Sequence, residues 1–133
     1  GMAEGLKEET NMKSVITEKA LNEMLEIVPL LGGKKETVTG LAGLGDLLTT
    51  GWSEKSYNFS VGEKLARSDK DPAKKPISKT QKPKSEGTVS IGGIAQLLGT
   101  NTRKYPLLQA IKGIIEGRKA PKELIAIAAI QDK

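Results

Sequence analysis

The feature that most constrains the fold is a helical repeat of apolar residues near the start of the chain. Between residues 11 and 31, apolar side chains recur at steps of three and four, with polar residues between them. This spacing places them on one face of an α-helix. We therefore predict a long amphipathic helix that Thr10 or Asn11 caps and Gly32-Gly33 end. The apolar residues are Val15, Ile16, Ala20, Leu21, Met24, Leu25, Val28 and Leu31.

The apolar residues available for a core also favour helices. The chain of 133 residues has one tryptophan, two tyrosines and one phenylalanine, so aliphatic side chains must form most of the interior. Such an interior suits helix packing better than a sheet rich in aromatic and β-branched residues. No alternating strand pattern occurs, and we expect a single all-α domain of about five to seven helices.

Composition excludes several kinds of site. The chain has no cysteine and no histidine, so it offers no thiolate or imidazole metal ligand, no Cys nucleophile and no His general base. We expect no metal. No apolar run approaches the roughly 20 residues that cross a bilayer, so we expect no membrane partner. Lack of cysteine agrees with a reducing compartment, and we expect a cytoplasmic protein.

Two segments differ from the helical pattern. Residues 1–10 are expected to be an N-terminal extension in which Gly1 is a scar of tag cleavage, and residues 11–133 the helical domain. Within that domain, residues 68–86 contain six lysines and three prolines. This segment has too few apolar side chains to offset the entropy of ordering, which predicts a mobile insertion. Its charge is typical of phosphate or nucleic-acid binding, but no aromatic residue supplies a stacking surface, and we expect no nucleic-acid partner.

The segment from Thr37 to Thr50 (TVTGLAGLGDLLTT) is apolar and rich in glycine. It is not a dinucleotide-binding loop, because Leu48 replaces the third glycine and no strand precedes it. Its glycines are consistent with close helix packing. If Asp46 begins a helix, Thr50 lies one turn along the same face, and both side chains can point into one polyol-binding cleft. The spacing equally allows Asp46 to be a helix cap or a salt-bridge partner.

This segment also carries a family resemblance. Together with NMKSVITEKALNEMLEIVPLLGG before it and SYNFSVGEKLA after it, it resembles the C-terminal domain of NAD(P)-dependent glycerol-3-phosphate dehydrogenases. The GLAGLGDL core is specific to that family. The similarity is strong from Asn11 to Ala66 and looser from Lys84 to Ile130. It implies an all-α domain like that of 6-phosphogluconate dehydrogenases, which closes over substrate bound at an N-terminal Rossmann domain.

The resemblance also implies a reaction and a site. In the family, a hydride passes between NAD or NADP and C2 of dihydroxyacetone phosphate or sn-glycerol 3-phosphate, and a lysine transfers the proton. The motif aspartate lies beside that lysine and the substrate, and a Ser-Arg-Asn element follows. The residues implied here are Asp46, Thr50, Ser56, Tyr57 and Asn58 for the substrate, and Lys84 and Glu86 for the cofactor.

The chain departs from the family in several respects. Tyr57 stands where the family has a phosphate-binding arginine, and a neutral phenol cannot supply a permanently charged bidentate donor. Residues 5–10 do not match the segment of the family's catalytic lysine. No Rossmann pattern occurs. The chain alone is therefore expected to contain no catalytic residue, to bind NAD or NADP only with a Rossmann partner, and to be inactive in isolation.

Two functions follow as alternatives. The first is the substrate-binding domain of a glycerol-3-phosphate dehydrogenase, with glycerol 3-phosphate or dihydroxyacetone phosphate as ligand and a separate Rossmann domain as partner. The second is a stand-alone, non-catalytic helical module for binding or dimerisation, in which Tyr57 marks lost catalysis. A homodimer is left open. A neighbouring coding sequence with a strand–GxGxxG–helix pattern would favour the first.

Overall fold

The computed structural model describes residues 1–6, 10–67 and 85–130, and all of their regular structure is helical. The predicted all-α fold is confirmed. The described residues contain eight α-helices, so the predicted number of about five to seven was too low. In order, the elements are α1 (Met2–Gly5), α2 (Thr10–Leu30), α3 (Lys35–Thr39), the π-helix η1 (Leu41–Gly45), α4 (Asp46–Gly51), α5 (Tyr57–Arg67), α6 (Glu86–Leu98), the 3-10 helix η2 (Gly99–Lys104), α7 (Pro106–Ile115) and α8 (Glu123–Ala128).

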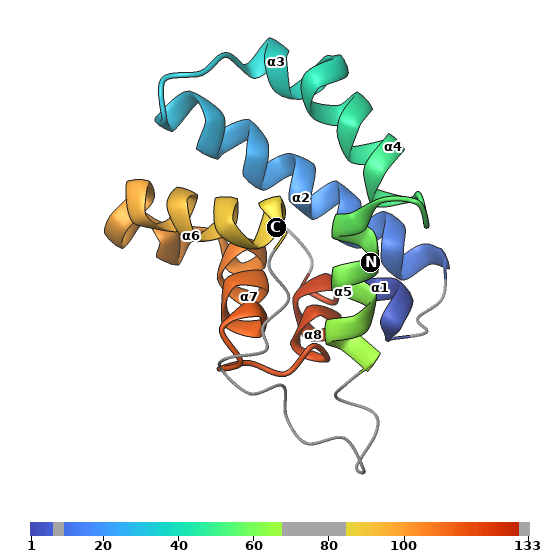
Figure 1. The fold of residues 1–133 in the computed structure, drawn as a ribbon. Coiled ribbons are helices and arrows are strands. Elements are labelled where there is room, and N and C mark those ends of the chain that lie inside the picture. The colour runs from blue at the N-terminus through green and yellow to red at the C-terminus, as the bar shows by residue number, and fades with distance from the viewer. Residues whose placement is uncertain (7–9, 68–84, 131–133) are drawn as a thin grey trace.

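The long helix α2 ends as predicted. Gly32 adopts a φ of 89°, a left-handed conformation that glycine reaches without steric cost. The N–H of Gly32 donates to the carbonyl of Pro29 at 3.0 Å, and that of Gly33 donates to the carbonyl of Val28 at 2.8 Å. These two bonds form a Schellman motif, which satisfies carbonyls at the helix end. The chain then returns beside α2 as α3, η1 and α4 (Figure 1).

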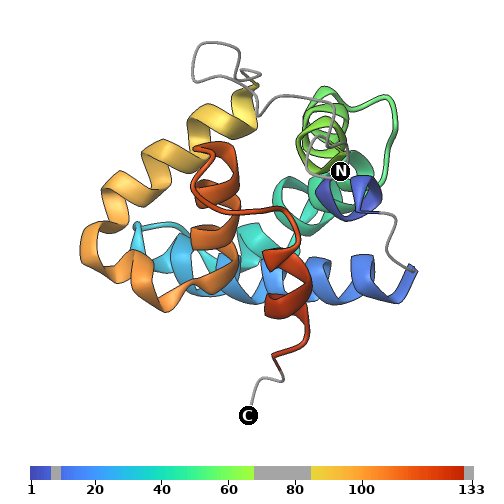
Figure 2. The same ribbon diagram turned by 90° about the horizontal axis from the view of Figure 1, so that it is seen from below.

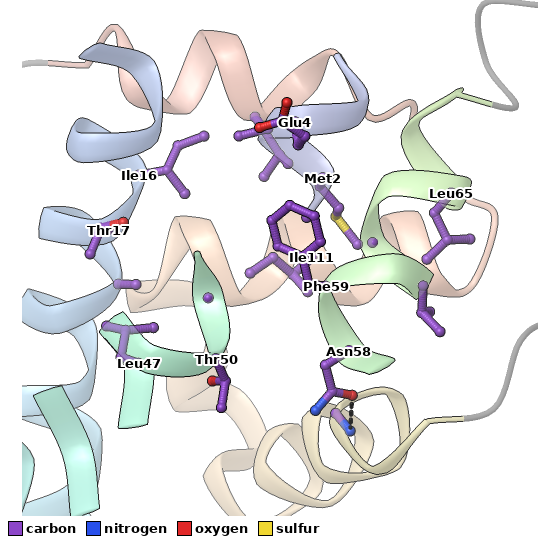
Figure 3. Close-up of a pocket in the computed structure, with 18 of the residues that line it drawn as sticks. Met2, Glu4, Ile16, Thr17, Leu47, Thr50, Asn58, Phe59, Leu65 and Ile111 are labelled. Carbon is purple, nitrogen blue, oxygen red and sulfur yellow. Dashed lines mark hydrogen bonds between the residues drawn. The ribbon is translucent and has the colours of Figure 1, made fainter. Parts of the chain in front are cut away.

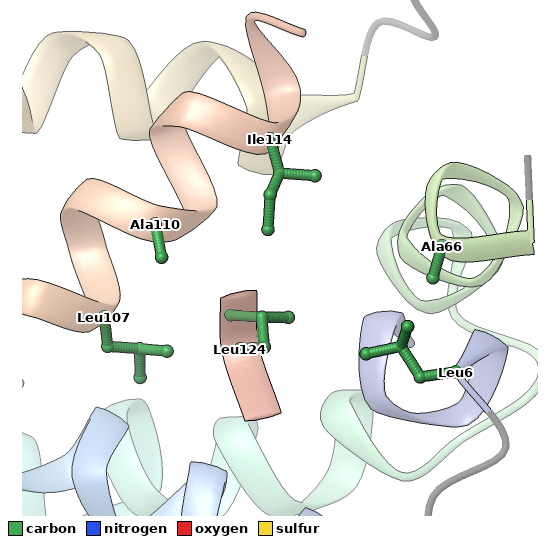
Figure 4. Packing of buried hydrophobic residues seen from close by; sticks show 6 residues of the cluster. All are labelled: Leu6, Ala66, Leu107, Ala110, Ile114 and Leu124. Atoms are coloured by element: carbon green, nitrogen blue, oxygen red, sulfur yellow. The ribbon is translucent and has the colours of Figure 1, made fainter. Parts of the chain in front are cut away.

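The other side of α2 carries the hydrophobic core. Helices α7 and α8 pack against α2 and against each other, and α6 packs on α7 (Figure 2). One buried cluster joins α5, α7, α8 and the residue after α1 (Figure 4). A second joins α2, α6 and α7. The members of the first are Leu6, Ala66, Leu107, Ala110, Ile114 and Leu124, and those of the second are Ile27, Leu98, Tyr105 and Leu108.

The first six residues pack into this core. Helix α1 crosses α5 closely because glycines face the crossing on both helices. A Cβ added to Gly5 would lie 2.5 Å from the carbonyl oxygen of Glu63, and one added to Gly62 would lie 2.9 Å from the backbone nitrogen of Met2. Leu6 is 3% exposed. Hydrophobic periodicity gave no sign of this packing, because α1 is only four residues long.

The Lys/Pro-rich segment is described only at its end. Residues 68–84, including Lys84, lie outside the described residues. Ser85 and Glu86, which composition assigned to the insertion, instead start α6. The Ser85 hydroxyl accepts from the N–H of Thr88 at 3.2 Å, and the Ser85 N–H donates to the Thr88 hydroxyl at 2.9 Å. This capping box begins the helix. It is not evident from the sequence, because the lysines of the segment predict an insertion that extends through Glu86.

Helix α7 is capped by a carboxylate from another helix. Its first residue is Pro106, and Tyr105 before it makes no side-chain cap. Glu23 on α2 supplies one: its carboxylate accepts from the N–H of Leu107 at 2.7 Å and from the N–H of Leu108 at 2.9 Å. These amides have no partner within the helix. Burial raises the pKa of the Glu23 carboxyl, and the two N–H donors oppose this rise.

Removing this cap should destabilise the fold. We expect Glu23→Ala to lower the free energy of unfolding by about 1–2 kcal/mol, whereas Glu18→Ala on the exposed face of the same helix should change it by less than about 0.5 kcal/mol. Because the pKa of Glu23 is raised in the folded state, its contribution to stability is largest below the ordinary Glu pKa and declines as pH rises through the raised value.

Urea unfolding at mildly acidic and neutral pH measures both effects. The difference between the wild type and Glu23→Ala should be smaller at neutral pH. Equal losses of unfolding free energy for Glu23→Ala and Glu18→Ala would show that the hydrogen bonds from α7 to Glu23 contribute nothing to stability.

Candidate functional site

A cavity of about 350 Å³ lies where α1, α2, α4, α5, α6 and α7 meet (Figure 3). Most of its lining side chains are apolar, contributed by all of these helices. Polar groups are few. They are Glu4, Lys13, Thr17, Thr50, Asn58, Ser85 and Thr88. A concave, mostly apolar site with a few convergent polar groups is typical of small-molecule binding, so this cavity is the candidate functional site.

Two of the predicted site residues, Thr50 and Asn58, line the cavity (Figure 3). The Thr50 hydroxyl donates to the carbonyl of Asp46 at 2.8 Å. This bond commits its hydrogen and leaves the oxygen lone pairs available. The Asn58 Oδ1 accepts from the N–H of Gly87 at 3.2 Å. The structure therefore brings together one hydroxyl and one carboxamide from segments that the resemblance assigned to substrate binding.

Asp46 begins α4, which is the condition on which the spacing argument depended. Thr50 follows one turn later, which agrees with the predicted spacing. The Asp46 side chain is exposed, however, and the described lining of the cavity does not include it. An acidic residue in the first turn also interacts favourably with the helix dipole. The role of Asp46 toward a substrate therefore stays a prediction.

The remaining predicted residues lie at the ends of α5 and α6. Ser56 precedes α5, and its hydroxyl faces the N–H of Phe59 at 3.4 Å, which is the position of a helix cap. Tyr57 is 62% exposed. With Glu86 it borders a second hollow, of about 610 Å³, between α5 and α6. Lys84 lies outside the described residues. The predicted set is thus divided between the cavity and this hollow, with Asp46 and Ser56 lining neither.

Sequence reasoning missed a charged group at the cavity. Lys13 on α2 pairs with the carboxylate of Glu4, and its Nζ lies 5.8 Å from the centroid of the Trp52 ring. Among the described lining residues, Lys13 is the only basic side chain. Its position on the polar face of the predicted helix gave no hint of this role. Only the packing of α1 and α4 beside α2 brings these three residues together.

The glycine-rich motif has a packing function at one position. Gly43 is buried in the π-helical turn η1, and a Cβ there would lie 2.1 Å from the carbonyl oxygen of Val38. No other residue fits this approach of η1 to α3. The N–H of Gly45 donates to the carbonyl of Gly40 at 3.1 Å, which is the five-residue step of a π-turn. Such turns are frequent at functional sites, and this one leads directly into Asp46.

No cluster of three or more acidic, His or Cys side chains able to hold a metal occurs within residues 1–6, 10–67 and 85–130. Over the same ranges, none of the helices combines the length and the apolar character needed to pass through a bilayer.

Comparison with known proteins identifies the domain. Residues 1–126 match the family model described as the C-terminus of NAD-dependent glycerol-3-phosphate dehydrogenase. The chain belongs to this family. The match includes the first ten residues, which composition had set apart from the helical domain.

Individual relatives agree with the family model. A glycerol-3-phosphate dehydrogenase (NAD(P)+) of Acaryochloris marina is 33% identical over 133 residues, covering 100% of this chain and 41% of the relative. The glycosomal glycerol-3-phosphate dehydrogenase (NAD(+)) of Leishmania mexicana is 35% identical over 126 residues, covering 95% of this chain and 34% of the relative. The glycerol-3-phosphate dehydrogenase (NAD(P)+) of Tropheryma whipplei is 32% identical over 127 residues, covering 96% of this chain and 35% of the relative. The chain thus spans between a third and about two fifths of the length of these relatives.

The packing of Gly43 can be tested by adding one methyl group. We expect Gly43→Ala to lower the free energy of unfolding by about 2 kcal/mol or more, because its Cβ would overlap a backbone carbonyl. Gly51→Ala is the matched control: its Cβ would lie 3.9 Å from Leu47, an ordinary contact, and the change should be neutral or stabilise by up to about 1 kcal/mol. Urea unfolding compares them, and similar effects of the two substitutions would contradict a special role for Gly43.

Proposed function

We propose that this chain is the substrate-binding domain of an NAD(P)-dependent glycerol-3-phosphate dehydrogenase, with glycerol 3-phosphate or dihydroxyacetone phosphate as its ligand. The family match over residues 1–126 is the observation that carries the proposal. The meeting of Thr50 and Asn58 at one cavity supports it. A hydroxyl and a carboxamide are suitable partners for the hydroxyl or carbonyl groups of a three-carbon polyol phosphate.

The proposed roles follow the positions of the side chains. Thr50 and Asn58 hydrogen-bond the carbon skeleton of the substrate at the cavity. Asp46, one turn before Thr50, orients the proton-transferring group of the family. Ser56 and Tyr57, at the start of α5, face the phosphate end.

The cofactor needs a second domain in this proposal. NAD or NADP, when bound, accepts or supplies the hydride. The described residues contain no β-strand and therefore no Rossmann unit. In this proposal they form only one edge of the dinucleotide site. The exposed carboxylate of Glu86 can accept a hydrogen bond from a cofactor hydroxyl there, and Lys84 stays a proposed cofactor residue. A Rossmann domain, in the same protein or separate, is the proposed partner.

Tyr57 favours one alternative function. An exposed phenol at the position of the family's arginine leaves this element without a fixed positive charge. A non-catalytic helical module that derives from the same domain, and that binds a partner or dimerises, is therefore the second candidate.

Restoring the charge at residue 57 distinguishes the two candidates. We expect Tyr57→Arg to bind glycerol 3-phosphate about tenfold more tightly than the wild type, because a charge-assisted hydrogen bond exceeds a neutral one by roughly 1.4 kcal/mol. Tyr57→Phe is the control, since it removes the hydroxyl without adding charge. Isothermal titration of the 133-residue chain with glycerol 3-phosphate, and with glycerol as the phosphate-free ligand, measures the affinities.

The preference for glycerol 3-phosphate over glycerol decides between the two candidates. The Arg variant should prefer glycerol 3-phosphate over glycerol, and the Phe variant should behave as the wild type does. Equal affinity of the Arg variant for the two ligands would place the phosphate away from residue 57. Binding of neither ligand by any of the three proteins would favour the non-catalytic module.

A further inference from the structure

One hydrogen bond joins the two segments that the family resemblance assigned to substrate and to cofactor. Asn58 on α5 accepts, through Oδ1, from the N–H of Gly87 on α6 at 3.2 Å, across 29 residues of sequence. Gly87 lies in the first turn of α6, where backbone amides have no partner within the helix. The Ser85–Thr88 capping box uses the amide of Thr88 but not that of Gly87. The side chain of Asn58 therefore adds a second side-chain cap at the start of α6.

This bond determines which way the carboxamide faces. A backbone N–H can only donate, so the atom of Asn58 that meets it must be the oxygen. The Nδ2 donor is then on the other side of the amide group, which in Figure 3 is the side toward Thr50. The Thr50 hydroxyl has committed its hydrogen to the carbonyl of Asp46 and offers an acceptor. The two residues thus present one donor and one acceptor at the cavity, which match a hydroxyl group, since a hydroxyl both donates and accepts.

The contact with Asn58 leaves little room for a side chain at Gly87. A Cβ added there would lie 3.0 Å from the Asn58 Oδ1 and 3.3 Å from its Cγ, so the carboxamide would have to shift. The backbone of Gly87 has no positive φ that would require glycine. Gly92 of the same helix offers a contrast, since a Cβ there would meet nothing within 4 Å. Glycine inside a helix is destabilising relative to alanine, and the close approach of Asn58 is what distinguishes Gly87 from Gly92.

We propose that Gly87 is the positioning residue for Asn58. It admits the carboxamide to the start of α6 and orients it so that Nδ2 donates to a hydroxyl of the polyol ligand. The ligand part of this inference rests on the proposed function. The orientation of the carboxamide does not, because it follows from the contact between α5 and α6 alone.

The first experiment needs no ligand. In ¹⁵N-labelled protein, Gly87→Ala should shift the side-chain amide resonances of Asn58, whereas Gly92→Ala should leave them in place and raise the melting temperature. Hydrogen exchange at the Gly87 amide should accelerate at least several-fold in Asn58→Ala. Unchanged Asn58 resonances in Gly87→Ala, or unchanged exchange in Asn58→Ala, would overturn the positioning role.

The second experiment adds glycerol 3-phosphate to the same proteins. Asn58→Asp keeps an acceptor for the Gly87 amide but loses the donor, so slow exchange at Gly87 should be rescued while affinity falls about tenfold, the effect of one lost hydrogen bond. Gly87→Ala should lose a similar factor, and Gly92→Ala should match the wild type. Wild-type affinity in Asn58→Asp would overturn the role of Nδ2. If the wild type itself binds no glycerol 3-phosphate while the ligand-free results hold, the proposed function fails and the positioning role is supported.

Discussion

The fold depends on the carboxylate of Glu23, which lies between α2 and the first turn of α7. It accepts hydrogen bonds from two backbone N–H groups that have no partner within α7. These bonds join the start of α7 to α2. Both helices are walls of the cavity, α2 through Ile16, Thr17 and Ala20 and α7 through Leu107 and Ile111. The cap therefore stabilises the contact between two helices that line the candidate site.

The site itself is built where short helices begin. Asp46 starts α4, Ser56 and Tyr57 start α5, and Glu86 starts α6. Starts of helices expose backbone amides that need acceptors, and side chains such as Ser56, Ser85 and Asn58 meet that need before any ligand binds. Two of these capping groups also line the site: Asn58 lines the cavity, and Ser85 lines both the cavity and the α5–α6 hollow. This explains why polar side chains occur there although the surrounding interior is apolar.

Much of the fold could be predicted from local patterns, and much of the site could not. The apolar repeat predicted the helix α2 and the glycines after it predicted its end, and the structure confirms both, although Val15 and Leu31 of the repeat are exposed. The Ser85–Thr88 cap was hidden by the lysines around it, and α1 was too short to show a period. The pairs Glu4–Lys13, Glu23–Leu107 and Asn58–Gly87 join different helices. Tertiary packing alone creates such contacts, so spacing along the chain could not reveal them.

The charges beside the cavity do not favour the binding of a phosphate group there. Lys13, the only basic side chain among the described residues of the cavity lining, is held by Glu4 and lies over Trp52. An anion at that position would have to displace a carboxylate. Tyr57 adds no charge to the hollow beside α5, where Glu86 is negative. If the proposed function is correct, the apolar cavity with Thr50 and Asn58 receives the carbon skeleton of the ligand, and we propose that Lys84 or a partner domain supplies the charge for its phosphate.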